Sequence, residues 1–355
     1  MDLFEDLPEP ERKKDSTLPE SKVQDWNNVN MEFFLDLPLP SSTSSEVRGV
    51  KRKLNESDPD SSVTDHAEEL YDVQGYYAEK KGEREEMQDC HVVINDFHKH
   101  VPQLHPSVSR LSYYAVFDGH GGSRASKFAA DQLHVNLALK FPKVSFLQIE
   151  KEIKRTLIEV FKKTDEEFLK HATKTKPSWK DGTTAIVVLV IQNILYIANL
   201  GDSKAILCRY NKDAEKYVAV PLSIDHSPTD YKERMRIQKA GGCVRDGRVM
   251  GIIEVSRSIG DGQYKALGIT SVPDIKRCQL SDNDAFILLA CDGLWKVFTS
   301  EQVLEIVLSS KKECTDGDQE EICYETACNK LVNEAVRKHS GDNVTVVILS
   351  IRKHH

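Results

Sequence analysis

The sequence predicts an α+β fold in which antiparallel sheets are layered, with helices on their outer sides. Strand-like segments follow one another in adjacent runs, and helix-like segments come in pairs, instead of alternating one for one along the chain. One-for-one alternation would favour a doubly wound parallel sheet. In addition, Gln192 and Asn193 join two very apolar segments in the manner of a tight hairpin turn.

The predicted strands are short segments rich in β-branched, aromatic and aliphatic residues, which is the composition of buried strands. In chain order they are residues 71–79, 90–94, 111–117, 183–191, 194–200, 286–290 and 343–351. The hairpin turn lies between the fourth and the fifth of them.

The predicted helices show apolar side chains at helical spacing. Residues 123–139 form the first, and a long amphipathic helix follows, marked by Ile149, Ile153, Leu157 and Phe161 at every fourth position. A shorter helix ends over residues 235–240, where two glycines close it. A late helix is marked by Tyr324, Cys328, Leu331 and Ala335.

Residues 1–68 differ in composition from the rest of the chain. They hold six of the thirteen prolines together with many serines and aspartates. Such a stretch cannot bury enough apolar area to offset the entropy lost on ordering. We therefore expect a disordered, acidic and proline-rich tail over residues 1–68 and one globular domain over residues 69–353.

Two features of this tail have a functional and an ordinary interpretation. Residues 2–10 and 32–40 both place aromatic and leucine side chains beside acids and before proline. They are a duplicated docking peptide or a chance likeness within an acidic tail. A short basic cluster consists of Arg48 and residues 51–53. It can be interpreted as a nuclear import signal or as a solvated run of charge.

Composition and charge exclude several classes of protein. The net charge is -8 and the pI is about 5.9, so a nucleic acid or an anionic membrane would on average repel the chain. The start is acidic and lacks the apolar core of a secretory signal, and no apolar run approaches the roughly 20 residues of a membrane helix. We expect a monomer in the cytoplasm, and in the nucleus if the basic cluster acts as an import signal.

The eight cysteines show no Cys-x-x-Cys pair and no zinc-like spacing. We expect free thiols in a reducing compartment. No cysteine has an arginine six residues later, which a thiol phosphatase would need. A covalent cysteine mechanism is therefore not expected.

Aspartates fall at the ends of apolar strands or at glycine turns. Asp118 follows residues 115–117, and Asp292 follows residues 288–291. Asp202 and Asp342 each follow a glycine beside a predicted strand. Several carboxylates that converge raise one another's pKa and are tolerated when a cation neutralises them. Oxygen ligands of this kind suit magnesium or manganese.

Two such cations, roughly 3.5–4 Å apart, can activate one bridging water and bind a phosphoryl oxygen. His120, two residues after Asp118, has the ordinary pKa for protonating a leaving alkoxide near neutral pH. Each feature has an ordinary interpretation when taken alone, because Asp-Gly is a common turn and His120 or Arg84 could be a surface residue. The prediction depends on the whole set.

This set resembles the metal-dependent type 2C serine/threonine protein phosphatase family over residues 71–351. The matching motifs occur in the family's order at residues 84–89, 117–122, 181–185, 199–203, 255–261, 290–293 and 342–343. The resemblance implies a four-layer α-β-β-α sandwich of two antiparallel sheets flanked by helices. It also implies hydrolysis of phosphoserine and phosphothreonine in proteins. Residues 1–4, 81–84 and 253–257 are closer to one member, a likeness that implies integrin-linked kinase as a partner.

The resemblance implies a metal-binding role for several positions. Asp118 would bridge two Mg²⁺ or Mn²⁺ ions, and the Gly119 carbonyl would bind one of them. Asp292 and Asp342 would bind the other. Asp89 would lie beside them and orient metal-bound water.

Three further positions take roles from the same resemblance. Arg84 would grip the substrate phosphate, as a planar cation suited to oxyanions. His120 would be the general acid. Asp202 lies where family members hold a weaker third metal.

Three residues depart from the family pattern. Gln88 replaces a frequent glutamate, so one carboxylate near the metals is lost. Lys296 stands where some members have an aspartate near the third metal. Because a lysine there would repel a cation, whether a third metal binds stays an open question. Lys204 replaces an arginine, and we expect it to pair with nearby acids.

The alternative to an active enzyme is a non-catalytic adaptor on the same fold. A degenerate scaffold would have no physical reason to keep mutually repelling carboxylates, so their retention favours the enzyme. A nucleotide hydrolase is not expected, because the chain has no Gly-x-x-x-x-Gly-Lys-Ser/Thr phosphate loop.

Overall fold

The computed structural model describes residues 70–313 and 320–353, which lie within the unit Asp65–His355. The predicted tail over residues 1–68, with its two similar segments and its basic cluster, lies outside the described residues.

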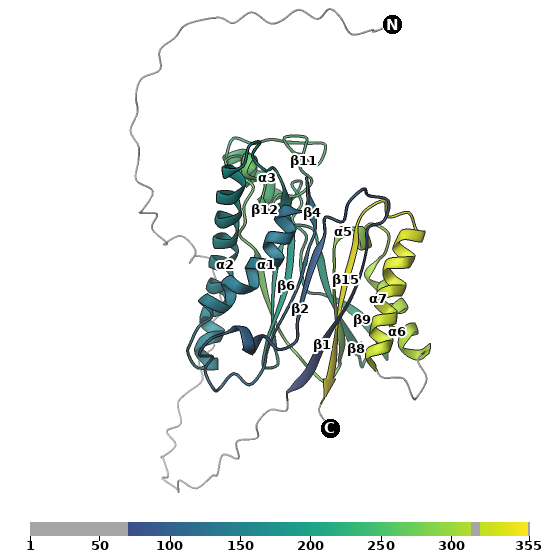
Figure 1. Cartoon of the computed structure of the whole chain (residues 1–355). Coiled ribbons are helices and arrows are strands. Elements are labelled where there is room, and N and C mark those ends of the chain that lie inside the picture. Colours follow the sequence, from purple (N-terminus) through teal and green to yellow (C-terminus); the bar gives the residue numbers. More distant parts are fainter. Residues whose placement is uncertain (1–69, 314–319, 354–355) are drawn as a thin grey trace, which may run out of the picture. The chain divides into compact units, whose positions relative to one another are not determined.

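Two five-stranded sheets form the centre of the domain (Figure 1). The first sheet has the order β1-β15-β14-β8-β9, with strands Tyr71–Lys80, Val344–Lys353, Asp284–Ala290, Lys204–Asn211 and Lys216–Pro221. The second sheet has the order β13-β7-β6-β3-β2, with strands Asp274–Gln279, Ile194–Leu200, Ala185–Ile191, Leu111–Phe117 and Cys90–Ile94. All neighbouring strands within these two sheets are antiparallel.

Two pairs of helices cover the outer faces of the sheets, as Figure 1 shows. Helices α1 (Arg124–Lys140) and α2 (Phe146–Lys174) share an apolar core with the second sheet. Helices α6 (Ser300–Glu313) and α7 (Glu320–Arg337) share another with the first sheet. A third core lies between the two sheets. The predicted four-layer α-β-β-α sandwich is therefore confirmed.

Strand β3 shows why the strands appear as unbroken apolar runs. All seven of its side chains are buried. Tyr113, Ala115 and Phe117 belong to the core under the helices, whereas Tyr114 and Val116 belong to the core between the sheets. Successive side chains of a strand point to opposite faces, so a strand with both faces buried needs apolar residues at every position.

Some elements were not predicted. The buried residues of β8 and the set Val303, Leu304 and Val307 in α6 are apolar signals that the prediction omitted. Strand β13 has little such signal, because it is an edge strand whose side chains are largely exposed. Pairing with β7, rather than an apolar pattern, therefore defines this edge.

The predicted strand 183–191 is divided in the structure. Thr184 lies between β5 (Gly182–Thr183) and β6, and it donates its backbone N–H to the carbonyl of Asp118 at 2.9 Å. Strand β5 pairs with β4 (Gly119–His120) and β12 (Ile259–Gly260) in a separate small sheet.

The segment between β9 and β13 holds the shorter predicted helix, α3 (Tyr231–Lys239), followed by the glycine pair. Gly241 has φ +84°, the left-handed conformation that commonly ends a helix. The same segment contains the hairpin of β10 (Val244–Arg245) and β11 (Arg248–Val249) and the short helix α4 (Gly262–Lys265).

The expectation of free thiols holds for six cysteines, which are Cys90, Cys208, Cys243, Cys278, Cys291 and Cys328. Cys323 contradicts it, because it is disulfide-bonded. No sequence signal indicated this bond, since the cysteines follow no recognisable spacing.

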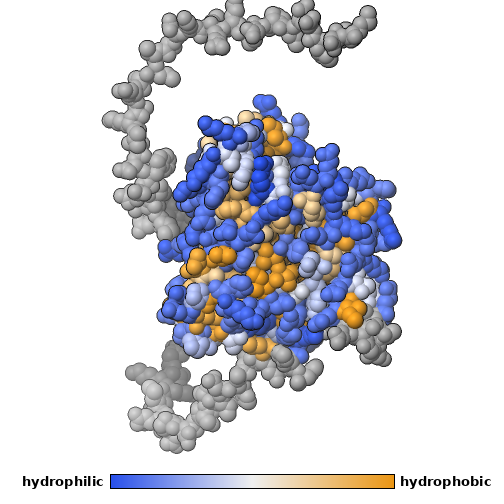
Figure 2. Space-filling view, viewed as in Figure 1, coloured by the Kyte–Doolittle hydropathy of each residue, from blue (hydrophilic) through white to orange (hydrophobic). Residues whose placement is uncertain are grey.

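The surface in Figure 2 carries hydrophilic side chains over most of the visible face, with apolar ones mainly toward the middle. Among residues 70–313 and 320–353, no helix combines the length and apolar character needed to cross a membrane.

Candidate metal centre

The predicted site residues meet at one cavity of about 450 Å³. Its lining includes Arg84, Asp118, Gly119, His120, Asp202, Asp292 and Asp342. These residues come from positions up to 258 residues apart, as the contact between Arg84 and Asp342 shows. Asp89 is the one predicted residue that does not line the cavity.

Strand ends and short turns position the acids. Asp118 follows the last residue of β3, and Asp292 begins the short helix α5 (Asp292–Trp295) just after β14. Asp202 lies in the turn between β7 and β8. Because β3 and β14 belong to different sheets, the acids meet where the two sheets adjoin, and oxygens of Asp118, Asp202 and Asp292 lie within 4.8 Å of one another.

A second group lies deeper and joins Asp89, Asp118 and Cys291, whose ligand atoms also lie within 4.8 Å of one another. Burial raises the pKa of Asp89 to about 7, and the charges of Asp342 and Asp292 add to the effect. Asp89 accepts a hydrogen bond from Thr345 Oγ1 at 2.8 Å, which fixes its orientation.

The donor set fits a hard divalent cation. Burial and the charges of Asp89 and Asp292 raise the pKa of Asp118 well above its usual range, so the carboxylate lacks a sufficient counter-charge in the protein alone. Carboxylate oxygens suit Mg²⁺ or Mn²⁺. The nearby sulfur of Cys291 does not compete, because burial raises the pKa of this thiol and keeps it protonated.

Gly119 is at a position that only glycine fits. A Cβ atom there would lie 2.2 Å from the carbonyl oxygen of Gln88. The backbone of Gln88 donates to Asn343 Oδ1 at 2.7 Å and accepts a hydrogen bond from Ser126. Gln88 therefore has a structural role through its backbone.

His120 is held by an aspartate to which the sequence analysis assigned no role. His120 Nε2 lies 2.7 Å from Oδ2 of Asp261, which also accepts a hydrogen bond from Ser258 Oγ at 2.6 Å. Burial lowers the pKa of His120, but the charge of Asp261 and its hydrogen bond raise it more, so the net shift is upward. The available sequence signal was that Asp261 lies within the motif at residues 255–261.

Two basic side chains already contact the acids. Arg84 Nη2 lies 2.9 Å from Oδ2 of Asp342, and its side chain is 53% exposed at the cavity. Lys296 Nζ lies 2.7 Å from Oδ2 of Asp292 and 3.2 Å from Oδ2 of Asp342. Burial lowers the pKa of Lys296, but both carboxylates raise it more, so the ammonium form is favoured.

Asp202 lies at the cavity beside the other acids. Burial and the charge of Asp292 raise the pKa of Asp202 to about 7, and Lys296 opposes this shift. The prediction for Lys204 is confirmed, because its Nζ lies 3.3 Å from the carboxylate of Asp225.

Comparisons with known proteins agree with this geometry. A sequence model of the family Protein phosphatase 2C matches residues 75–344. Integrin-linked kinase-associated serine/threonine phosphatase 2C from Bos taurus is 52% identical over 374 residues, covering 99% of this chain and 100% of that protein. The Homo sapiens protein of the same name is 51% identical over 395 residues, with coverage of 99% and 100%.

Solved structures share the fold. One described as a C. elegans sex determining protein has a TM-score of 0.64 and 26% identity, covering 78% of this chain and 64% of that chain. Serine-threonine phosphatase 2C from Toxoplasma gondii has a TM-score of 0.65 and 18% identity, covering 80% of this chain and 95% of that chain. The second likeness concerns the fold alone.

Proposed function

Because the chain belongs to the protein phosphatase 2C family, we propose that it is an active enzyme that hydrolyses phosphoserine and phosphothreonine in proteins. The observation that carries this proposal is the convergence of Asp118, Asp292 and Asp342 at one cavity with Arg84 at its rim. Carboxylates brought this close together repel one another unless a positive charge is shared among them.

The proposed cofactor is a pair of Mg²⁺ or Mn²⁺ ions. Asp118, the Gly119 carbonyl, Asp292 and Asp342 would hold them, and Asp89 would orient water beside them. Bound divalent cations supply Lewis acidity, which makes water a nucleophile at neutral pH and neutralises phosphoryl oxygens.

The charge of the site supports two cations rather than three. Two divalent ions, the Lys296 ammonium and the Arg84 guanidinium together carry six positive charges. They more than balance five carboxylates, those of Asp89, Asp118, Asp202, Asp292 and Asp342. Lys296 also contacts two of these acids directly. A third divalent ion beside Asp202 would therefore meet a nearby positive charge instead of an unbalanced negative one.

The remaining roles belong to side chains at the cavity. The exposed Arg84 guanidinium can bind two phosphoryl oxygens in its plane. His120 is favoured in its protonated form by Asp261, so it can give its proton to the leaving serine or threonine oxygen. Asp261 holds the imidazole in a fixed orientation for that transfer.

A non-catalytic adaptor is the second candidate, and one observation favours it. Arg84 and Lys296 already form ion pairs with Asp342 and Asp292, so part of the acidic charge is balanced within the chain. An adaptor could keep these acids for stability without binding a metal.

Metal-restored hydrolysis separates the two candidates. The chelated protein should regain hydrolysis of a phosphothreonine peptide on addition of Mn²⁺ or Mg²⁺, and calorimetry should count two ions per chain. Asp292→Asn should lose activity, whereas Asp213→Asn, an exposed acid outside the cavity, should not. A chelated protein that stays inactive and binds no Mn²⁺ would establish the adaptor and refute the enzyme.

We propose a partner, a location and an assembly state for the chain. The relatives at 52% and 51% identity are named for association with integrin-linked kinase, and we propose the same association here. Capture of that kinase should decrease when residues 1–68 are deleted, and equal capture would refute a docking role for the tail. We also propose a monomer, in the cytoplasm and nucleus, with import lost when Arg48 and residues 51–53 are changed to alanine.

A further inference from the structure

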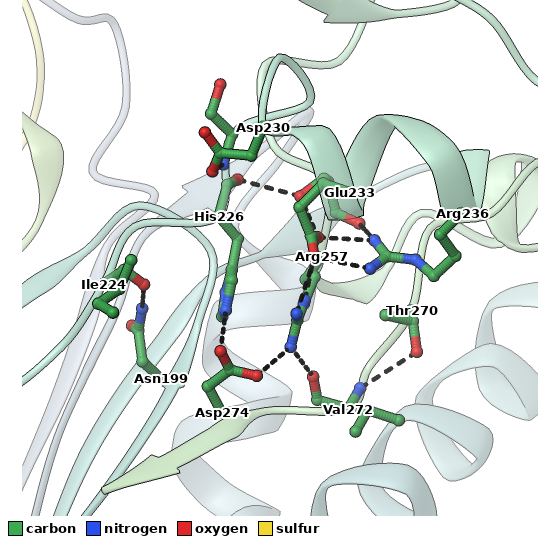
Figure 3. A network of polar contacts seen from close by, with 12 residues as sticks. Asn199, Ile224, His226, Asp230, Glu233, Arg236, Arg257, Thr270, Val272 and Asp274 are labelled. Atoms are coloured by element: carbon green, nitrogen blue, oxygen red, sulfur yellow. Dashed lines mark hydrogen bonds and ion pairs between the residues drawn. The ribbon is translucent and has the colours of Figure 1, made fainter. Parts of the chain in front are cut away.

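Figure 3 shows a buried polar network whose labelled residues do not line the cavity of the candidate site. At its centre is Glu233 of α3, whose side chain is only 4% exposed. Its carboxylate accepts hydrogen bonds from Arg236 at 2.8 Å, from Arg257 at 2.7 and 3.0 Å, and from Ser256 Oγ at 2.6 Å. Arg257 also donates to Asp274 Oδ1 at 2.6 Å.

The network reaches the turn that carries Asp202. His226, which is 3% exposed, lies with Nε2 3.3 Å from Oδ2 of Asp274, a looser contact than a well-aligned hydrogen bond. The ring Nδ1 of His226 accepts a hydrogen bond from the backbone N–H of Gly201 at 3.1 Å. The backbone N–H of His226 donates to the Gly201 carbonyl at 2.9 Å. His226 therefore holds the residue immediately before Asp202 by two hydrogen bonds.

The network also reaches the aspartate that holds His120. Arg257 lies four residues before Asp261 in the segment that runs along the cavity wall. Between them, the Ser258 N–H donates to the Thr270 carbonyl at 3.1 Å, and Ser258 Oγ donates to Asp261 at 2.6 Å. Arg257 thus anchors one end of the segment, and its other end contacts His120.

The Asp261 endpoint adopts a backbone conformation that needs such support, whereas glycine takes a positive φ without steric cost. Gly201 has φ +104°, and Asp261, although not a glycine, has φ +51°. A left-handed conformation costs a non-glycine residue roughly 1–2 kcal/mol and persists only where the surroundings determine it. Neighbouring contacts must therefore maintain the position of Asp261.

We propose that Glu233, Arg257, Asp274 and His226 form a positioning network that fixes Asp202 and Asp261 at the cavity. These four residues do not line the cavity, so they are positioning residues that act through the two aspartates. The inference rests on the proposed phosphatase activity for its kinetic consequence, but the anchoring itself is independent of catalysis. An error of about 1 Å in the position of a reacting group can reduce turnover by about a hundredfold.

The kinetic test compares two arginine ion pairs. Arg257→Lys keeps the charge but loses the paired hydrogen bonds to Glu233. Arg209→Lys is the matched control, because Arg209 binds the buried Asp284 through two bonds, of 2.5 and 3.0 Å, outside the cavity. With Mn²⁺ and p-nitrophenyl phosphate, we expect Arg257→Lys to lower kcat by at least about tenfold at little changed KM. The kcat of the control Arg209→Lys should fall by less than about twofold, although its melting temperature falls by a similar amount. Equal kcat losses in the two variants would overturn the proposal.

A structural test separates this inference from the proposed function. His226→Asn keeps an oxygen near the position of Nδ1 to accept the Gly201 N–H. The longer side chain in His226→Gln carries its amide beyond that position, so the hydrogen bond is lost. Hydrogen exchange of the metal-free full chain should be faster over residues 199–204 in the Gln variant than in the Asn variant. Equal exchange in the wild type and both variants would overturn the anchoring. If the wild type shows no phosphatase activity, the proposed function fails and this exchange measurement still decides the network.

Discussion

Replacing Lys296 with methionine tests how the chain balances its own acids before any metal binds. The ammonium lies 2.7 Å from Asp292 and 3.2 Å from Asp342, so the variant keeps most of the packing volume and removes two ion pairs. Both carboxylates are then left with less positive charge nearby. We expect the metal-free protein to lose stability and the metal-binding site to become more attractive to cations.

The magnitude follows from the exposure of the groups. Two unit charges 4 Å apart interact by about 4 kcal/mol at an effective dielectric constant near 20. The Lys296 side chain is 45% exposed, however, so solvent screening reduces each pair to about 0.5–1 kcal/mol. The sum is about 1–2 kcal/mol of metal-free stability. The same change should tighten Mn²⁺ binding by about fivefold to thirtyfold.

The assay is calorimetric titration of Mn²⁺ into chelated protein, paired with denaturant unfolding in the presence of the chelator. Lys330→Met is the control, because Lys330 pairs with Glu313 at 3.2 Å, is similarly exposed and lies outside the cavity. The control should leave Mn²⁺ affinity unchanged. Weaker or unchanged Mn²⁺ binding in Lys296→Met would refute the reasoning that Lys296 competes with the metal for these carboxylates.

Three further predictions follow from the described contacts. Burial raises the pKa of Glu233, but hydrogen bonds from Arg257 and Arg236 lower it more, so the folded pKa lies below the unfolded value of about 4.5. The stability from this group is thus present above that pH and lost as the pH falls below it. In denaturant unfolding, the loss of unfolding free energy caused by Glu233→Gln should be smaller at pH 3.5 than at pH 7. An equal loss at both pH values would contradict this. Gly119→Ala should cost about 2 kcal/mol and lower activity, because its Cβ would meet a carbonyl oxygen at 2.2 Å, and an unchanged melting temperature would show that the loop moves freely. Leu289→Ala, in the core between the sheets, should cost about 2–5 kcal/mol by denaturant unfolding, and a loss below about 1 kcal/mol would mean that the core collapses around the change.

Local sequence signals were sufficient to predict an element where burial follows a regular pattern along the chain. Strand β3 is apolar at every position because both of its faces are buried, and its composition alone identified it. The stripe from Ile149 to Phe161 identified α2 in the same way, since those side chains face a single core. The position of Asp118 after β3 then followed from the end of the apolar run.

The sequence could not predict contacts that depend on the tertiary fold. Strand β13 has charged, exposed side chains and is defined by its pairing with β7. The contact of Asp261 with His120 joins residues 141 positions apart through a left-handed turn. Likewise, Lys296 was expected only to repel a cation, and its two ion pairs depend on how α5 approaches Asp342.

The meeting of the two sheets at the acids has a mechanical consequence. Asp118 extends from a strand of one sheet, and Asp292 follows a strand of the other. An ion shared by these two side chains would cross-link the two sheets, so that the halves of the sandwich could no longer slide past one another. Chelation should therefore loosen the whole domain and increase its sensitivity to proteases, well beyond the few residues that hold the ion.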